Sequence, residues 1–325
     1  MPGPIVGNLT RRGVTLGVVP WSQAATWPEM LAVAQLAEAL GYEHLWTWDH
    51  LLAIYGDPDQ PIFEGWSTVA AWAMATRRIR IGLLVDANTT RNPGIVAKSA
   101  VTLDHISAGR AILGLGAGWH ELEHHAFGIE FGTSVGQRLD WLDEATGAIR
   151  GLLDGRPVTS PAGSHYAFDD LRHAPGPLQT HLPIMIGGGG EKKTLRTVAR
   201  YADLWNVSGS PAELAHKAEV LGEHCRAVGR DIAGIEFSLS VTLAIRDTAA
   251  EAESVMRAAI AHNRTPWSKV AGDALFMTGS PAEIADRLRP YVELGFRTIL
   301  AEQPAPFDVE TLKRFSGEVG PLLAS

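Results

Sequence analysis

Short apolar runs alternate along the chain with longer segments in which apolar residues recur every three or four positions. The first unit shows the pattern: Val14–Pro20 is almost continuously apolar, and Leu31–Leu40 has a helical distribution of apolar residues. Short apolar runs are typical of buried strands, whereas a period of about 3.6 residues is typical of amphipathic helices. The chain therefore begins with a strand followed by a helix.

This strand–helix unit recurs to the end of the chain. Eight strands are predicted, at Val14–Pro20, His44–Asp49, Arg80–Asp86, Ala111–Gly116, Pro183–Ile186, Asp203–Val207, Ile235–Ile245 and Thr298–Ala301. Helices are predicted at Leu31–Leu40, Trp66–Thr76, Pro93–Gly109, Gln137–Leu153, Lys192–Ala202, Pro211–Val228, Thr248–His262 and Ala285–Leu294. Strict alternation with apolar strands is typical of a parallel sheet covered by helices.

Local signals agree with these helix boundaries. The segments Thr26–Glu29, Ser134–Gln137 and Ser280–Glu283 have the spacing of a capping box, in which a hydroxyl and a Glu or Gln satisfy the first backbone N–H groups. Gly41 and Gly295 follow two of the helices, where a left-handed residue commonly ends the helix.

Eight units in 325 residues favour a closed (β/α)8 TIM barrel, formed by one domain over residues 1–325. Residues 156–180, rich in Pro, Gly and His, interrupt the alternation and are interpreted as an insertion. The alternative is an open Rossmann-like sheet with a second domain, but no linker or change of composition divides the chain.

Composition narrows the class of protein. Hydrophobic residues make up 46% and charged residues 20%, enough for a large core, and the net charge of −8 argues against nucleic-acid binding. No apolar run is long enough to span a membrane, and the N-terminal MPGPIVGNLTRRG lacks the apolar region of a signal peptide. The single cysteine, Cys225, fits a reducing compartment. We therefore expect a cytoplasmic protein.

The ends of the second and third strands carry polar residues, and the carboxyl ends of barrel strands are where active sites lie. Asp49 and His50 follow the second strand, and this pair could bind a polar ring and move a proton. Asp86 and Asn88 follow the third strand and could bind the edge of a heterocycle. The alternative for Asp49 and His50 is a helix-capping aspartate with a surface histidine, and the alternative for the segment after the third strand is a simple turn.

Glycines follow the fourth and fifth strands. The run Gly114–Gly118 lacks the spacing of a dinucleotide fingerprint, and its small residues, Gly116 and Ala117 among them, would let a ligand ring approach the backbone. Gly187–Gly190 and Glu191 lead directly into a helix, where backbone N–H groups favour a phosphate. A tight turn is the alternative interpretation.

One motif suggests a different class of enzyme. His120-Glu121-Leu122-Glu123-His124 matches H-E-x-x-H, in which His120 and His124 would bind zinc as in a hydrolase. Gly118 and Gly128 leave room for only about two helical turns, so a charged helix at the rim of the pocket is favoured over zinc.

Together these segments resemble the luciferase-like monooxygenase family, and especially its branch that uses the deazaflavin coenzyme F420. The resemblance covers nearly the whole chain and is carried by LGYEHLWTWDH, by RIRIGLLVDANTTRNPGIVAKSAVTLDHISAGRAILGLGAGWHELEHHAFGI and by LPIMIGGGGEKKTLRTVARYADLWN. It implies that Asp49 contacts the cofactor ring and that His50 acts as acid or base beside the reacting carbon. It further implies a bulge at Leu84-Val85, with a non-proline cis peptide, that supports the ring.

The resemblance assigns the remaining positions in the same way. The cofactor would contact Asp49, Leu84, Val85, Asp86, Asn88, Gly116, Ala117, Gly187, Gly188, Gly189, Gly190 and Glu191, with the phosphate on the amides of Gly188–Gly190. Trp21, Trp48, Trp66 and Trp119 would wall the substrate side, or could equally belong to the core. Sugar-phosphate dehydrogenases of this family have Trp and Glu where this chain has Ile54 and Trp119, which argues against a sugar phosphate.

The main hypothesis is hydride transfer between F420 and a small organic substrate, with His50 moving the proton. The alternatives are an FMN-dependent monooxygenase supplied by a separate reductase, the zinc hydrolase, and a protein that binds flavin without catalysis. The resemblance also implies a homodimer. His262–Gly279 is interpreted either as a lid or as an ordinary connection.

Overall fold

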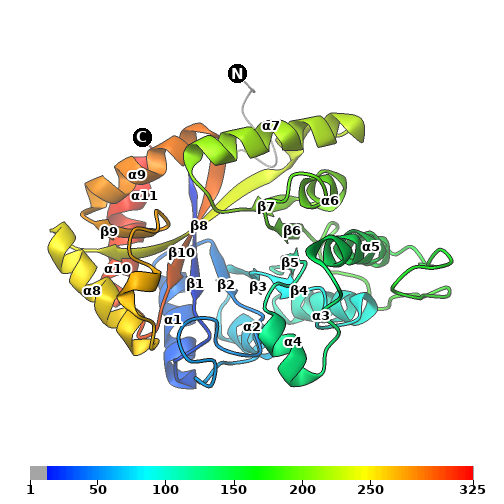
Figure 1. The fold of residues 1–325 in the computed structure, drawn as a ribbon, viewed down its shortest axis with the longest axis horizontal. Helices are drawn as coiled ribbons and strands as arrows, with labels where there is room; N and C mark the ends of the chain where they lie inside the picture. Colours follow the sequence, from blue (N-terminus) through cyan, green and yellow to red (C-terminus); the bar gives the residue numbers. More distant parts are fainter. Residues whose placement is uncertain (1–12, 325) are drawn as a thin grey trace.

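Parallel strands form the wall of a barrel in the computed structural model, which describes residues 13–324 (Figure 1). The strands are β1 (Thr15–Pro20), β2 (His44–Thr47), β3 (Arg80–Leu83), β4 (Asp86–Ala87), β5 (Leu113–Gly116), β6 (Ile184–Gly187), β7 (Leu204–Asn206), β8 (Glu236–Ile245), β9 (Phe276–Gly279) and β10 (Phe296–Gln303). Their order in the sheet is β3-β2-β1-β10-β8-β7-β6-β5-β4, and all the pairs are parallel.

The barrel closes between β3 and β5. Ile81 and Ala111 form a parallel bridge, and the Ile112 N–H donates to the Ile81 carbonyl at 2.9 Å. The predicted third strand is divided at Leu84-Val85 into β3 and β4, and β4 continues the ladder to β5. The predicted (β/α)8 barrel is therefore confirmed.

Helices surround this wall (Figure 1). They are α1 (Trp27–Ala39), α2 (Gly65–Ala75), α3 (Pro93–Ile106), α4 (Glu121–Phe127), α5 (Val135–Leu153), α6 (Thr194–Tyr201), α7 (Pro211–Ala227), α8 (Ala249–His262), α9 (Pro281–Glu293), α10 (Val309–Arg314) and α11 (Gly320–Ala324). Capping boxes form at Thr26–Glu29 and Ser280–Glu283 as predicted. The third predicted box forms only in part: the Ser134 hydroxyl accepts a hydrogen bond from the Gln137 N–H, but the Gln137 side chain accepts one from the Thr133 N–H instead. Within residues 13–324, no helix is long and apolar enough to cross a membrane.

Side chains alternate along the strands between two apolar layers. The larger layer lies between the strands and the helices, and the smaller fills the inside of the barrel, with Trp46, Ile112, Met185 and Leu300 fully or almost fully buried. Because successive residues of a strand point to opposite faces, both layers require the nearly continuous apolar strands that the sequence shows.

Two segments outside the strand–helix repeat have structure of their own. Residues 156–180 form the predicted excursion, in which Val158 and Leu171 make an antiparallel bridge. The candidate lid, His262–Gly279, ends in strand β9, which pairs in parallel with β8. The sequence missed β9 because the strand is short and only partly buried. The N-terminal stretch from which the absence of a signal peptide was predicted lies outside the described residues, apart from Gly13.

Candidate active site

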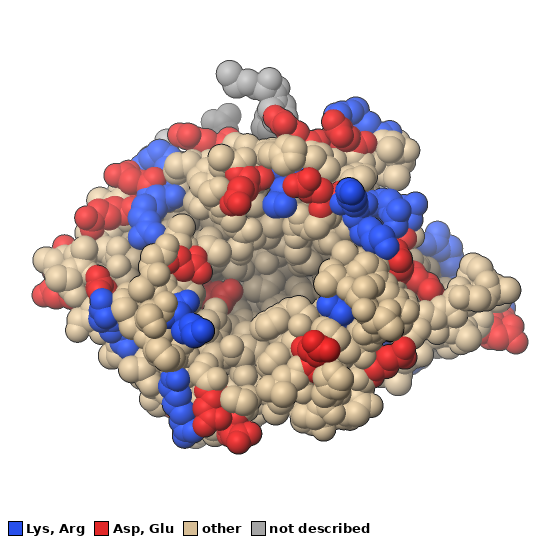
Figure 2. Space-filling model, viewed as in Figure 1, with Lys and Arg blue, Asp and Glu red and all other residues tan. Residues whose placement is uncertain are grey.

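The face of the molecule drawn in Figure 2 is hollowed at its centre, at the place where the strands meet in Figure 1. Helix α4, which follows β5, borders this hollow (Figure 1). Loops that follow the carboxyl ends of barrel strands form the active site in this fold. Most residues predicted for the site lie in these loops or at the strand ends before them, and Trp66 lies in α2, so the barrel gathers them from distant parts of the chain.

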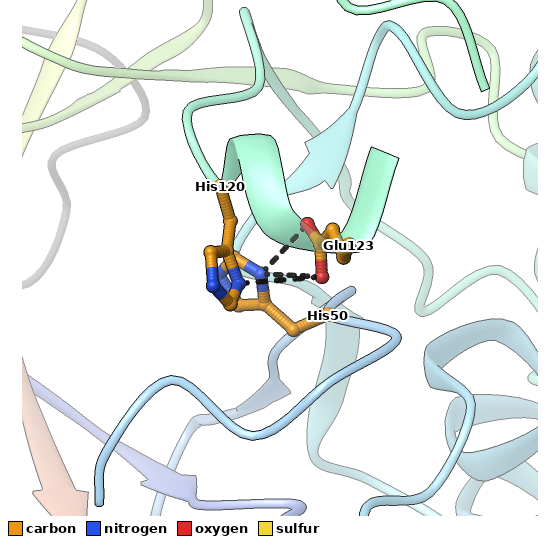
Figure 3. Close-up of side chains that lie close together, drawn as sticks. All are labelled: His50, His120 and Glu123. Atoms are coloured by element: carbon orange, nitrogen blue, oxygen red, sulfur yellow. Dashed lines mark hydrogen bonds and ion pairs between the residues drawn. The ribbon is translucent and has the colours of Figure 1, made fainter. Parts of the chain in front are cut away.

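His50 is paired with a carboxylate on α4 (Figure 3). Its Nδ1 lies 3.1 and 3.2 Å from the two oxygens of Glu123, and the Leu51 N–H donates to the same carboxyl at 2.9 Å. Burial works against ionisation of Glu123, but these hydrogen bonds outweigh it and lower its pKa. Because a carboxylate only accepts, Nδ1 of His50 is the donor, and Nε2 is left to exchange a proton with a ligand.

The H-E-x-x-H motif does not form a zinc site. His124 is buried; its Nε2 bonds the Thr89 hydroxyl at 2.6 Å and its Nδ1 bonds the His120 carbonyl at 2.8 Å. Both ring nitrogens of His124 are therefore engaged. Helix α4 has seven residues, as short as the flanking glycines predicted.

A different set of three residues could hold a cation. His50, His120 and Glu123 offer ligand atoms within 4.8 Å of one another, the single such group among the described residues. Nδ1 of His120 lies 3.7 Å from Glu123 and is buried without a hydrogen-bond partner, and burial lowers the pKa of this ring. Two imidazoles and a carboxylate are ligands that zinc accepts. The same atoms thus form a hydrogen-bonded pair and a potential metal site.

Asp49 and Asp86 lie in a buried charge cluster. Arg91 donates from Nη1 to Asp49 at 2.6 Å and to Asp86 at 3.1 Å, and from Nη2 to Glu64 at 2.8 Å. The Trp66 indole N–H donates to Asp86 at 2.7 Å, so this tryptophan points to the cluster. Burial, and then the neighbouring Asp86, raises the pKa of Asp49 well above its ordinary range. The arginine that holds both acids together was not identified from the sequence.

The predicted bulge is present, with a cis peptide bond between Leu84 and Val85. The Val85 side chain occupies space beside the glycines of two neighbouring strands: a Cβ on Gly114, Gly116 or Gly187 would stand 3.0, 2.6 or 3.2 Å from its methyl groups. Gly114 and Gly116 were interpreted as making room for a ligand ring, and Gly187 as part of a phosphate loop. In the structure Gly116 and Gly187 leave the space that Val85 occupies, whereas a Cβ on Gly114 would first overlap the Leu83 carbonyl oxygen.

Some backbone groups of the glycine loop after β6 already make hydrogen bonds within the protein. The Gly188 N–H bonds the Asn206 carbonyl at 2.9 Å, so this amide is not free for the predicted phosphate contact. Gly188 has φ +118, a conformation that favours glycine. Lys217, on α7, lies beside the loop, 2.8 Å from the Gly189 carbonyl and 3.4 Å from Glu191. The sequence did not reveal this cation, because α7 meets the loop only in the folded chain.

The remaining predicted residues have varied surroundings. Trp119 is 61% exposed, stacks on His120 and makes a T-shaped contact with His50, so it lies at the His50–Glu123 pair. Asn88 is buried and bonds the hydroxyl of Tyr166, a residue of the insertion, at 3.0 Å. Ala117 lies after β5, next to Gly116.

Three rings stack at the end of β1 and beyond β2. Trp21 has no exposed surface and is stacked on Tyr55, with ring centroids 4.2 Å apart, while Trp48 lies 4.9 Å from Trp21. Trp21 therefore supports Tyr55 from beneath. Tyr55 stands next to Ile54, the position at which sugar-phosphate dehydrogenases of the family were expected to have Trp.

Glu302 is an acid that sequence reasoning missed. It is the residue before the last of β10, keeps some exposed surface, and accepts a hydrogen bond from the Trp21 indole at 3.0 Å. Burial raises the pKa of this carboxyl to about 7, although the bond from Trp21 opposes the shift. The predicted last strand stopped at Ala301, one residue short of it.

The family model for luciferase-like monooxygenases matches residues 11–298. The chain belongs to this family. It is 27% identical over 323 residues to 5,10-methylenetetrahydromethanopterin reductase of Methanolobus tindarius, covering 88% of this chain and 94% of that protein.

Solved structures share the fold. An F420-dependent secondary alcohol dehydrogenase in complex with an F420–acetone adduct has a TM-score of 0.82 at 21% identity, covering 96% of this chain and 99% of that one. The oxygenating constituent of 3,6-diketocamphane monooxygenase from Pseudomonas putida, in complex with FMN, has a TM-score of 0.71 at 17% identity, covering 95% and 98%.

The contact between Gly116 and Val85 predicts a compensating pair of substitutions. Gly116→Ala should lower the free energy of unfolding by about 1–3 kcal/mol, because the new methyl group overlaps Val85. In a Val85→Ala background the same change should cost much less, since the overlapping methyl groups are gone. Urea unfolding of the four proteins measures the coupling. Equal costs in both backgrounds would show that Val85 does not explain the glycine.

Glu302 predicts a pH-dependent difference in stability. Its pKa rises from 4.5 to about 7 on folding, so burial of the carboxyl increasingly destabilises the fold as pH rises through this interval. The difference in free energy of unfolding between Glu302→Gln and the unaltered protein should therefore shift by about 1–3 kcal/mol in favour of Glu302→Gln from pH 5 to pH 8.5. This range allows for residual contact of the carboxyl group with solvent. Urea unfolding at both pH values measures this, with exposed Glu223→Gln as control. A pH-independent difference would contradict the shifted pKa.

Proposed function

We propose that this protein transfers a hydride between coenzyme F420 and a small organic substrate. The observation that carries the proposal is the His50–Glu123 pair at the hollow end of a luciferase-like barrel. The similarity to a methylenetetrahydromethanopterin reductase along nearly the whole chain supports the same reaction class. A deazaflavin supplies two-electron hydride chemistry when it is bound, and the protein supplies position and a proton path.

The residues around the hollow fit a flavin-type cofactor. The glycine loop Gly187–Gly190, with Lys217 beside it, suits the phosphate, because small residues expose backbone and the lysine adds positive charge. The bulge at Leu84-Val85, flanked by Gly116 and Ala117, would support the ring. Asp49 and Asp86 would act through Arg91, because their carboxyl groups are directed to that guanidinium.

His50 would move the proton that accompanies the hydride. The Glu123 carboxylate holds Nδ1–H and stabilises the imidazolium whenever Nε2 gains a proton. Trp119 would cover the ring from the solvent side. At the place where sugar-phosphate dehydrogenases of the family carry their glutamate, this chain presents an indole, and the carboxylate comes instead from Glu123, one helical turn farther along.

An FMN-dependent monooxygenase supplied by a separate reductase is the second candidate. The likeness to an FMN-bound oxygenating protein favours it, since the same barrel end would accept either isoalloxazine-like ring. In both cases we propose a cytoplasmic homodimer, the assembly that the resemblance implies.

Titration with the two cofactors separates these candidates. F420 and FMN are added in parallel to purified protein, and binding is followed by quenching of tryptophan fluorescence. We expect F420 to bind at least ten-fold more tightly than FMN. The reverse preference would favour the oxygen-dependent reaction, and binding of neither would refute both proposals.

Substitution of His50 tests its role. His50→Ala should lower kcat by about 10²–10⁴-fold while F420 affinity changes little, because the imidazole moves a proton and does not anchor the cofactor. Stopped-flow kinetics and the fluorescence titration give both values. His125→Ala, a 71% exposed histidine of α4, is the matched control. Unchanged turnover in His50→Ala would refute the assignment.

A further inference from the structure

The side of the hollow formed by β10, β1 and β2 contains a carboxyl group that the proposed proton path does not use. Glu302 lies two residues after Leu300, whose side chain belongs to the apolar cluster inside the barrel. Because side chains two positions apart in a strand point to the same face, Glu302 is directed into the mouth of the barrel. The strand order places β1 between β10 and β2, the strand that leads to His50.

No positive side chain of residues 13–324 compensates this carboxyl group. No described Lys, Arg or His forms an ion pair with Glu302, whose carboxyl group accepts a hydrogen bond from the neutral indole of Trp21. Two acids act on the neighbouring Tyr55. Burial raises the pKa of its hydroxyl most, and the charges of Glu302 and then Asp273 raise it further. Among the described residues, Glu302 therefore has no countercharge.

Aromatic rings surround the same position. Tyr55, which keeps some exposed surface, stacks on Trp21 and meets Phe276 edge-on, with ring centroids 6.4 Å apart. Trp48 lies 6.0 Å from Tyr55. The faces of such rings attract cations, and the attraction grows when the cation is removed from water.

We propose that the substrate carries a basic nitrogen, bound as a cation by the Glu302 carboxylate beside Tyr55 and Trp48. This names the substrate class for the proposed function and rests on it. The class is that of small organic amines and iminium ions. The nitrogen would face β10, which leaves the rest of the molecule directed toward β2 and His50.

A bound cation would compensate the charge of the buried carboxyl group. An ionised carboxyl in apolar surroundings is unfavourable unless a partner charge and hydrogen-bond donors accompany it. A protonated amine supplies both. A neutral alcohol of the same shape supplies a hydrogen bond but no charge, so a site built this way should discriminate between the two.

Two simple molecules test this recognition without any cofactor. Benzylamine and benzyl alcohol have nearly the same shape and differ in charge at pH 8. Each is titrated into the full-length protein, with binding followed by calorimetry. We expect benzylamine to bind at least ten-fold more tightly than benzyl alcohol. Equal binding, preference for the alcohol, or no measurable binding of benzylamine would overturn the proposal.

Two variants assign the preference to its residue. Glu302→Gln keeps an acceptor for Trp21 but removes the charge, and should abolish the preference for benzylamine. Asp273→Asn removes an exposed acid from the same side and should retain it. Retention of the preference in Glu302→Gln would refute the assignment. Since neither titration contains F420, failure here leaves the hydride-transfer proposal to its own cofactor titration.

Discussion

Closure of the barrel between β3 and β5 is the constraint on which the site depends. The third strand leaves the ladder at Leu84-Val85 and rejoins it as β4, and Gly116 and Gly187 leave the space that Val85 occupies there. Closure also brings the ends of β2 and β5 together, so that His50 meets Glu123 from 73 residues away. Without this seam neither the bulge nor the histidine–glutamate pair would exist.

Buried acids around the hollow have three different surroundings, and these decide what each can do. Glu123 accepts hydrogen bonds from His50 and a backbone N–H, so it remains ionised and orients the imidazole. Asp49 and Asp86 share Arg91 and serve to hold the loop after β4. Glu302 has an indole N–H but no cation among residues 13–324, so of these acids it is left to respond to the charge of a ligand. Position within one barrel thus gives similar side chains separate tasks.

Much of the architecture could be predicted because it depends on local patterns. The strands and their helices follow from apolar periodicity, and the capping boxes at Thr26 and Ser280 from residues three positions apart. The bulge at Leu84-Val85 was placed at the correct residues through resemblance to the family. Strand β9 was missed because its pairing with β8 gives no strong signal in a short, half-buried segment.

The sequence by itself determined the barrel fold, the resemblance to the luciferase-like family, and which strand ends carry polar residues. Only the tertiary structure decided which of those residues meet. The H-E-x-x-H letters allowed a zinc site on His120 and His124, which the short helix disfavoured, and the fold turns His124 to Thr89 and places Glu123 against His50. Glycines that suggested space for a ligand were found to accommodate Val85. The physical reason is that helix and strand formation depend on neighbours along the chain, whereas hydrogen bonds and buried charges depend on which distant segments the closed barrel brings into contact.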